Sequence, residues 1–283
     1  MAQYQCPDTL TKALAQLDDN PDETIVMAGG TTIVPFLRSG DEETVLLDIS
    51  RISQLKTVSV GTEIIIGSTV TLTELLGFVA EHVQNPVLRA LGDVAGRIAD
   101  PIMRNQATVG GNVARGGELA SMLLALDGDA IFTSASGGTR RIRLAECLAE
   151  EGVTALGQPN ELLTAVVARD QPYQYVYYDK FTRSHLASIP LASIAVTETN
   201  TGEIRVVLGS HRLFPERLNH VERRIRDLGY DLPLKGGTDR VMSAALGPLA
   251  LSDDAFQMRI IYVLIERALR GENPKPALEV TCP

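Results

Sequence analysis

Apolar residues near the start of the chain recur at the spacing of one helix face. Leu10, Leu14 and Leu17 follow this pattern, and Asp8 or Thr9 can cap the first turn. The pattern predicts a helix over 10–17.

Short apolar runs bounded by turn-forming residues follow this helix. They predict three strands, at 24–28, 45–49 and 64–66. The first of these strands leads directly into a pair of glycines, which marks an abrupt change of chain direction.

Capping signals then predict two helices in succession. Thr71 and Glu74 have the spacing of a capping box, and the Asn85-Pro86 pair is typical of a helix start. A glycine-rich stretch over 108–117 comes next, and a further apolar helix is predicted over 118–126.

The pattern changes near residue 170. Two predicted strands, 188–198 and 203–208, are joined by Asn200-Thr201-Gly202, which is typical of a hairpin. Helices are predicted over 215–227 and 253–269, and the intervening 228–252 is rich in turn formers. We therefore predict an α+β chain of two domains, 1–170 and 171–283.

Composition narrows the possible functions. The chain has 283 residues, 45% of them hydrophobic, and a net charge of -9, so a non-specific nucleic-acid surface is not expected. Since no apolar run approaches the ~20 residues that cross a bilayer, and the start has no signal-peptide pattern, we expect a cytoplasmic protein without a membrane span.

Residues for metal binding or acid–base catalysis are sparse. Cys6, Cys147 and Cys282 are too few to hold an iron–sulfur cluster alone, and the four histidines lack metal-ligand spacing. No serine-nucleophile motif is present. We predict no metal site and no catalytic side chain within this chain.

Two glycine pairs are the main chemical signal. Paired glycines can present consecutive backbone N–H groups to an anion, and nearby threonines add neutral donors. Two such segments could close on the two phosphates of one dinucleotide, or each could simply form a tight turn. Neither a Rossmann fingerprint nor a P-loop is present. The two segments are Ala28-Gly29-Gly30-Thr31-Thr32 and Thr108-Val109-Gly110-Gly111-Asn112.

A third candidate is a tyrosine-rich stretch before Lys180. Tyr173, Tyr175, Tyr177 and Tyr178 nearly alternate, which is typical of strand packing, although a tyrosine or the lysine could also flank a flavin ring. Residue chemistry by itself therefore predicts a dinucleotide or phosphate binder.

Six blocks of sequence, in this order, resemble one enzyme family. They are 27–32 (MAGGTT), 46–50 (LLDIS), 66–75 (IGSTVTLTEL), 102–112 (IMRNQATVGGN), 177–183 (YYDKFTR) and 253–259 (DDAFQMR). The fourth block is close to the IRNxGTIGGN signature of the FAD-binding subunit in the xanthine dehydrogenase and carbon monoxide dehydrogenase family. The resemblance spans nearly the whole chain.

The resemblance implies a fold and a cofactor site. The fold would be a p-cresol methylhydroxylase-type FAD-binding domain of two subdomains, followed by a smaller α+β domain like the C-terminal domain of carbon monoxide dehydrogenase flavoproteins. The glycines and threonines of both segments would hold the FAD diphosphate, with Asn112 nearby, and Lys180 would approach the isoalloxazine ring. The cofactor-binding residues implied are Ala28, Gly29, Gly30, Thr31, Thr32, Thr108, Gly110, Gly111, Asn112, Glu118 and Lys180.

Glu118 marks a departure from the family pattern. The family usually has an aspartate here, after a segment of small residues, and this acid binds the ribose of FAD. Here Arg115-Gly116-Gly117 replaces that segment, and the loop is shorter. We hypothesise that the longer glutamate side chain compensates for the shorter loop.

The family's division of labour implies a function for the chain. A large partner subunit would hold the molybdenum cofactor, and a small one would pass electrons through [2Fe–2S] clusters to FAD and on to NAD⁺ or another acceptor. The alternatives are a stand-alone flavin reductase of related fold, a non-catalytic nucleotide-binding module, and a purely structural assembly subunit. Substrate and acceptor are not encoded in any motif of this chain.

Overall fold

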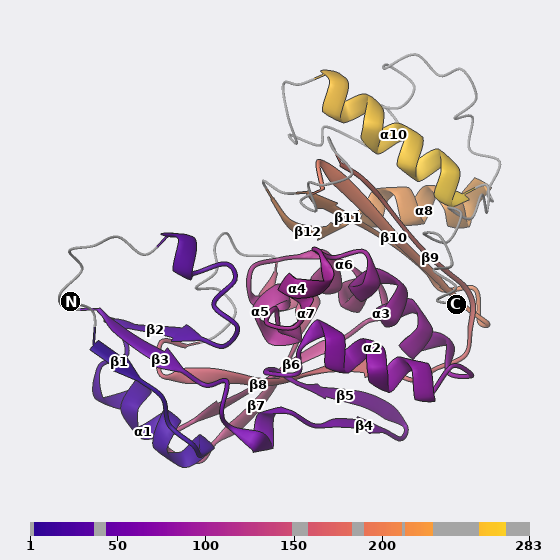
Figure 1. Ribbon diagram of the computed structural model, residues 1–283. Coiled ribbons are helices and arrows are strands. Elements are labelled where there is room, and N and C mark those ends of the chain that lie inside the picture. The colour runs from indigo at the N-terminus through magenta and orange to yellow at the C-terminus, as the bar shows by residue number, and fades with distance from the viewer. Residues whose placement is uncertain are drawn as a thin grey trace, which may run out of the picture.

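The structure, a computed structural model, contains three β-sheets with helices packed between and around them (Figure 1). It describes residues 3–36, 44–148, 158–182, 190–210, 213–228 and 255–269.

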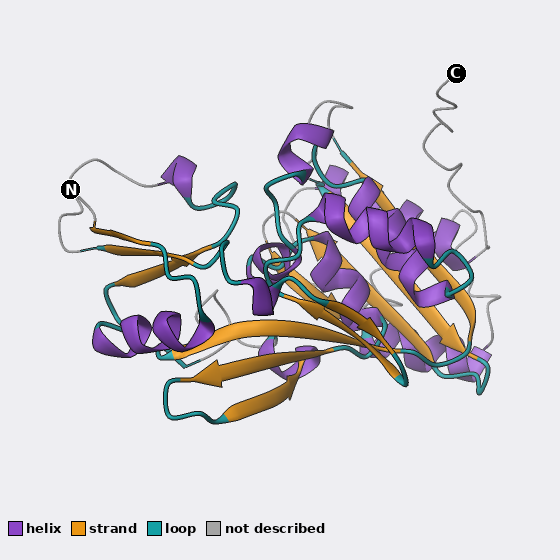
Figure 2. Cartoon of the chain, turned by 60° about the horizontal axis from the view of Figure 1, so that its bottom comes forward, coloured by secondary structure: helices purple, strands orange, loops and turns teal. Residues whose placement is uncertain are grey.

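The N-terminal part is a three-stranded parallel sheet in the order β1-β3-β2. Helix α1 packs on it through Leu14 and Leu17, which are buried together with Leu47 of β3. In Figure 2 this unit stands beside one end of the larger sheet. Its elements are β1 (Gln3–Gln5), α1 (Leu10–Asp19), β2 (Thr24–Met27) and β3 (Val45–Asp48), with 3₁₀ helices at Val34–Phe36 and Ser53–Leu55.

A five-stranded antiparallel sheet follows, in the order β4-β5-β8-β6-β7. Strand β8 lies at its centre and pairs with both β5 and β6, so a late segment completes a sheet that began much earlier in the chain. The strands are β4 (Val58–Val60), β5 (Glu63–Gly67), β6 (Asp129–Ser134), β7 (Thr139–Arg143) and β8 (Glu161–Arg169).

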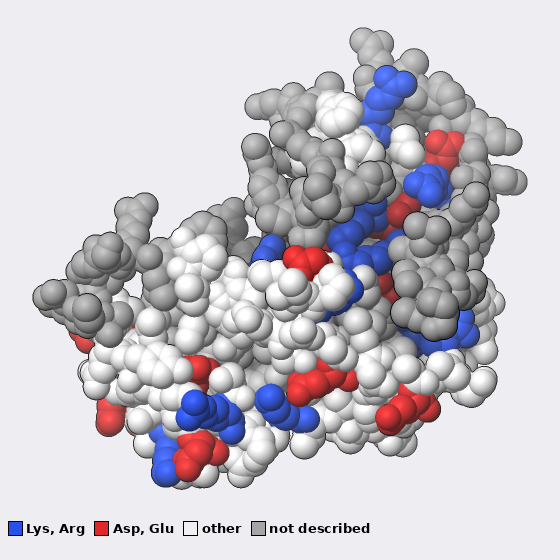
Figure 3. All heavy atoms as spheres, viewed as in Figure 1, with Lys and Arg blue, Asp and Glu red and all other residues white. Residues whose placement is uncertain are grey.

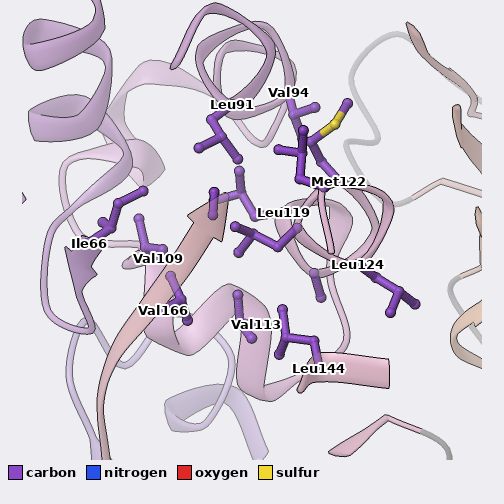
Figure 4. Close-up of a cluster of buried hydrophobic side chains, with 14 of the residues drawn as sticks. Ile66, Leu91, Val94, Val109, Val113, Leu119, Met122, Leu124, Leu144 and Val166 are labelled. Atoms are coloured by element: carbon purple, nitrogen blue, oxygen red, sulfur yellow. The ribbon is translucent and has the colours of Figure 1, made fainter. Parts of the chain in front are cut away.

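Helices cover one face of this sheet and form the main core with it. Figure 4 shows Leu91 of α3, Val113 of α5 and Leu119 of α6 meeting over Ile66 and Val166 of the sheet, and all five are fully buried. The helices are α2 (Leu72–Glu81), α3 (Pro86–Gly96), α4 (Pro101–Arg104), α5 (Val109–Ala114), α6 (Glu118–Ala125) and α7 (Leu144–Cys147).

The C-terminal part is a four-stranded antiparallel sheet in the order β12-β11-β10-β9. Successive residues of a strand face opposite sides, and β10 shows this clearly: Ala195 joins the core around α6, whereas Ile194 and Val196 join α8 and α10. The sheet therefore lies between two helical layers (Figure 1). The elements are β9 (Tyr173–Phe181), β10 (Ala192–Thr199), β11 (Ile204–Ser210), β12 (Leu213–Arg217), α8 (Asn219–Leu228) and α10 (Ala255–Leu269).

Most of the predicted elements are confirmed. Thr71 and Glu74 form the capping box, Asn85 caps α3, and the Asn200-Thr201-Gly202 turn joins β10 to β11 with Gly202 at a φ of 82°. The last strand of the larger antiparallel sheet, β8, ends at Arg169, and the first strand of the smaller one, β9, begins at Tyr173.

Two local predictions were wrong. The segment 108–112, expected to be a loop, contains the start of helix α5, because the Thr108 hydroxyl caps the helix and offsets the low helix propensity of the glycines. The predicted helix over 215–227 begins only at Asn219: Pro215 lies in β12, at the edge of its sheet, where a missing N–H costs no ladder bond.

Some predictions concern residues outside the described ranges. They include the turn-rich 229–252, the ends of the predicted elements at 188 and 253, Arg183 and Cys282. Among the described helices, none has the length and apolar content needed to cross a bilayer.

Glu161 gives the larger sheet a testable dependence on pH. Its carboxylate accepts hydrogen bonds from the Arg140 side chain, 3.0 Å from Nε, and from the Gln158 amide, which lower the pKa of Glu161 below 4.5. A carboxyl group whose pKa is lower in the folded than in the unfolded state stabilises the fold above its unfolded-state pKa, and this stabilisation is lost as pH falls through its folded-state pKa. We therefore expect Glu161→Gln to reduce the free energy of unfolding by about 0.5–1 kcal/mol at pH 7.

The same substitution should flatten the fall in stability below pH 4.5, measured by urea unfolding at several pH values. Glu81→Gln is the matched control, because Glu81 is exposed at the end of α2 and makes no ion pair with a described residue. If the free energy of unfolding depended on pH equally in the two variants, the stabilising role of ionised Glu161 would be contradicted.

Candidate functional site

The first glycine segment leaves β2 and turns back sharply. Gly30 has a φ of +68°, a backbone conformation that favours glycine, and the Val34 amide closes the turn on the Gly30 carbonyl at 2.9 Å. Among the described residues, no hydrogen-bond acceptor is paired with the N–H groups of Gly29, Gly30, Thr31 and Thr32. These half-buried amides form a strip of available donors, which we call the donor loop.

Gly29 also brings the donor loop into backbone contact with Gln106 and Ala107, the residues just before the second glycine segment. A methyl group on Gly29 would lie 1.7 Å from the Gln106 carbonyl oxygen and 3.3 Å from the Ala107 nitrogen. No side chain fits in that space, so only glycine allows this approach. The two predicted segments are therefore neighbours, as expected for one site.

The second segment, however, uses its own amides. The N–H of Gly110 donates to the Ser68 carbonyl at 2.9 Å, and the N–H of Gly111 donates to Thr108 Oγ1 at 3.1 Å. Gly110 is required by packing, because a methyl there would lie 2.6 Å from the Ser68 oxygen. The two segments look alike in sequence, but only the first has a run of uncommitted N–H groups among the described residues.

Asn112 holds the connection between α5 and α6. Its buried side chain accepts a hydrogen bond from the Leu119 amide at 2.9 Å, and its carbonyl accepts one from Gly117 at 2.8 Å. A methyl on Gly117 would lie 2.5 Å from Asn112 Nδ2. The side chain therefore fixes the loop that carries Arg115 and Glu118.

Arg115 reaches across to the donor loop. It follows the last residue of α5, its side chain is exposed, and its Nη1 lies 3.4 Å from Thr32 Oγ1. The structure thus places a cation beside the available amides. The sequence showed Arg115 only as a departure from the family pattern and gave no sign of this contact.

Glu118 and Lys180, predicted at opposite ends of the cofactor, form an ion pair with each other. Lys180 Nζ lies 3.0 Å from Glu118 Oε1 and donates to the Arg97 carbonyl at 2.6 Å. Both side chains are nearly buried, with 11% and 7% of their side-chain surface exposed. The pair joins α6 to β9, across the junction between the two larger sheets.

The junction carries further charges. Asp179, next to Lys180, forms an ion pair with Arg267 of α10 at 2.9 Å and lies 3.9 Å from Arg97, the residue that follows α3. Figure 3 shows basic and acidic side chains together where the C-terminal part meets the helices of the larger part. Among the described residues, no group of His, Cys, Asp and Glu is arranged to hold a metal ion.

The tyrosines of β9 pack on both faces of its sheet. Tyr177 belongs to the core beneath α10, and Tyr178 to the core around α6. Tyr175 donates to the Ala268 carbonyl at 2.6 Å, and burial raises the pKa of Tyr175 to about 12. Burial also raises the pKa of Tyr178 well above its usual value, so these phenols stay protonated. This favours the packing interpretation of the tyrosine-rich stretch.

The donor set fits a diphosphate. A run of backbone N–H groups, two threonine hydroxyls and one guanidinium are anion ligands that need no deprotonation. Nearby Gly29 keeps the surface free of a Cβ where a ligand would approach. At this place a run of uncommitted donors and the cation of Arg115 lie side by side.

Comparison with known proteins identifies the family of the chain. Residues 1–168 match the family model described as the FAD binding domain in molybdopterin dehydrogenase. No curated protein sequence matched the chain.

Solved structures of similar fold cover nearly the whole chain. Reconstituted carbon monoxide dehydrogenase from Oligotropha carboxidovorans has a TM-score of 0.79 at 22% identity, over 95% of this chain and 96% of that one. Quinoline 2-oxidoreductase from Pseudomonas putida 86 has a TM-score of 0.78 at 18% identity, over 96% of each chain. Carbon monoxide dehydrogenase from Hydrogenophaga pseudoflava, in a form lacking the Mo-pyranopterin moiety, has a TM-score of 0.76 at 22% identity, over 95% and 96%.

These likenesses confirm the predicted α+β fold of the FAD-binding subunits. The family model extends over more than half of the 283 residues. The chain therefore belongs to the FAD-binding family of the molybdopterin dehydrogenases: it is an FAD-binding oxidoreductase subunit of the molybdenum hydroxylase type.

Proposed function

We propose that this chain is the electron-transfer subunit of a cytoplasmic molybdenum hydroxylase. A small partner subunit supplies electrons from [2Fe–2S] clusters, a large one holds the molybdenum cofactor, and the electrons leave through the FAD of this chain to NAD⁺ or another acceptor. The observation that carries the proposal is the donor loop, a strip of uncommitted amides held against Gln106 by Gly29 in a chain of the FAD-binding family.

The chain's own residues bind and orient, because the bound FAD supplies the redox chemistry. The amides of Gly29, Gly30, Thr31 and Thr32 hold the diphosphate, and the threonine hydroxyls add neutral donors. Ala28 starts the loop at the end of β2. Electron transfer of this kind requires no substrate acid or base from this subunit.

The second glycine segment has a supporting role in this proposal. Thr108, Gly110, Gly111 and Asn112 fix the position of the 106–108 backbone, against which the donor loop rests. The amides of this segment already donate within the protein, so the segment contributes the shape of the FAD site and no N–H donors. The glycines are needed for close packing.

Glu118 and Lys180 act together in this proposal. Their ion pair sets the distance between α6 and β9, and thereby shapes the flavin pocket from the junction side. The sequence suggested instead that Glu118 binds the ribose of FAD. The two roles differ in whether Glu118 affects FAD affinity independently of Lys180.

The first test is the composition of the native assembly. We expect the chain purified from its source to carry FAD and to elute with molybdenum and iron in one complex, measured by flavin absorbance and metal analysis. FAD in the complex should be reduced by the substrate of the large subunit, whereas the isolated FAD-loaded chain should not react with that substrate. A lone chain that binds no FAD would contradict the proposal, and a lone chain reduced by NADPH and active on a small substrate would indicate a stand-alone reductase.

A second test concerns the backbone contact of Gly29. Gly29→Ala should push the donor loop away from Gln106 and lower FAD affinity more than tenfold, since a methyl would overlap the carbonyl oxygen. The measurement is titration of the apo chain with FAD. Gly77→Ala on α2 is the control, because a methyl there meets nothing within 4 Å. Equal FAD affinity of both variants would contradict the placement of the diphosphate.

The third test separates the two roles of Glu118. Lys180→Met takes the cation away from the buried Glu118 carboxylate, so it should cost on the order of 3–5 kcal/mol of unfolding free energy. Glu118→Gln should cost less, because Lys180 also donates to the Arg97 carbonyl. The double variant should recover a large part of that loss, which a double-mutant cycle by urea unfolding measures. A specific loss of FAD affinity in Glu118→Gln, absent in Lys180→Met, would instead favour the ribose role.

A further inference from the structure

We propose that Arg115 is a ligand of the FAD diphosphate, in addition to the backbone amides of the donor loop. The inference rests on the proposed seating of FAD on that loop. Arg115 lies in the short segment that departs from the family pattern, so its role does not follow from the resemblance.

The guanidinium is positioned for an anion and is not engaged by one within the protein. Its contact with Thr32 Oγ1, at 3.4 Å, is long and has a neutral acceptor. Among the described residues, no carboxylate lies within 4.0 Å of the Arg115 side chain. A guanidinium carries five N–H donors, so most of them remain available for a ligand bound at the donor loop.

The backbone at Arg115 is held in place. Gly116 follows it with a φ of +69°, and its amide bonds the Val113 carbonyl at 2.9 Å. A methyl on Gly116 would lie 2.5 Å from Phe214 Cδ1, so the chain passes closely under that ring. The tight turn therefore fixes the position of the Arg115 backbone at the end of α5, from which the side chain reaches Thr32 of the donor loop.

Arg115 provides positive charge for a bound diphosphate. A diphosphate carries negative charge, the chain has a net charge of -9, and the stretch from 28 to 36 contains no lysine or arginine. Backbone amides and hydroxyls are neutral, so Arg115 supplies the positive charge at this place. Its planar fork also matches two phosphate oxygens at once, which an ammonium group cannot do.

Several other arginines among the described residues are engaged by carboxylates. Arg140 pairs with Glu161, Arg141 with Glu63 and Arg217 with Glu222. Arg89, on the exposed face of α3, also lacks a carboxylate partner among the described residues, but it has no hydrogen bond to either glycine segment. Arg89 is therefore the matched control for a charge change without a site.

The test measures FAD and ADP binding to the full-length apo chain. We expect Arg115→Gln to lower the affinity of the chain for FAD roughly tenfold to a hundredfold, because a pair of charge-assisted hydrogen bonds is lost. Arg115→Lys keeps the charge and should lower the FAD affinity less. Arg89→Gln should bind FAD like the unaltered chain. The affinity for ADP, measured by displacement of FAD, should fall in Arg115→Gln by the same factor as the affinity for FAD. The binding of both ligands to this variant should also depend less steeply on salt concentration.

Each outcome bears on the inference. Equal FAD affinity in Arg115→Gln and Arg89→Gln would overturn it while leaving FAD binding by the chain intact. ADP binding unchanged by Arg115→Gln, with FAD weakened, would place the arginine at the flavin and overturn the diphosphate assignment. Thermal unfolding of the apo chain should be the same for Arg115→Gln and the unaltered chain, and a fall in melting temperature would indicate a structural role. No FAD binding by the unaltered chain would refute the proposed function itself.

Discussion

The contact between Gly29 and the Gln106 carbonyl is the constraint on which the rest of the site depends. The 106–108 backbone is held from its other side by the Leu72 amide, which donates to the Ala107 carbonyl at 2.9 Å, and by a bridge between Thr71 and Thr108. Since α2 starts at the same place, the segment is anchored to the main core. Gly29 then brings the parallel N-terminal sheet against this fixed segment, and the N–H groups of 29–32 are left without an acceptor among the described residues.

Burial of the C-terminal sheet on both faces creates the second constraint. Tyr178 and Ala195 contribute to the core around α6, so the C-terminal part is packed into the same hydrophobic unit as the FAD-binding part. Polar side chains at such a junction are costly unless they are paired. The Glu118–Lys180 pair and the ion pairs of Asp179 meet that requirement. They also make the relative position of α6 and β9 specific, which a purely apolar contact would define less sharply.

Local chemistry predicted a large part of the fold. Thr71 with Glu74, and Asn85 with Pro86, are capping signals that act within one helical turn, and both helices begin where these residues indicate. The turn at Gly202 is equally local. The two wrong predictions, a loop at 108–112 and a helix from 215, concern segments whose structure depends on contacts with other groups. Thr108 and the Ser68 carbonyl hold the start of α5, and pairing with β11 places Pro215 in a strand.

The sequence indicated which residue types make up the candidate site but not how they are arranged. Both glycine segments were recognised, and their proximity was expected, yet nothing within either segment distinguishes free amides from engaged ones. The Gly111 amide is engaged by Thr108 of its own segment, but the Gly110 amide is engaged by the carbonyl of Ser68, which lies far from it in the sequence. The Glu118–Lys180 pair joins residues 62 positions apart and is likewise set by tertiary packing. Patterns of residue type identify which groups can bind a phosphate, whereas long-range backbone contacts determine which of them are available.

Arg115 and Glu118, the two departures from the family pattern, owe their positions to the same short loop. Gly116 and Gly117 pass so close to Phe214 and Asn112 that the loop before α6 has no room for longer side chains. This compact path places Glu118 at the start of α6, where its carboxylate is buried against Lys180, and leaves Arg115 at the open side beside Thr32. A negative group is thus drawn into the junction and a positive one is kept at the donor loop. The net effect is to favour an anion at the loop, because the local charge there becomes more positive although the chain as a whole is acidic.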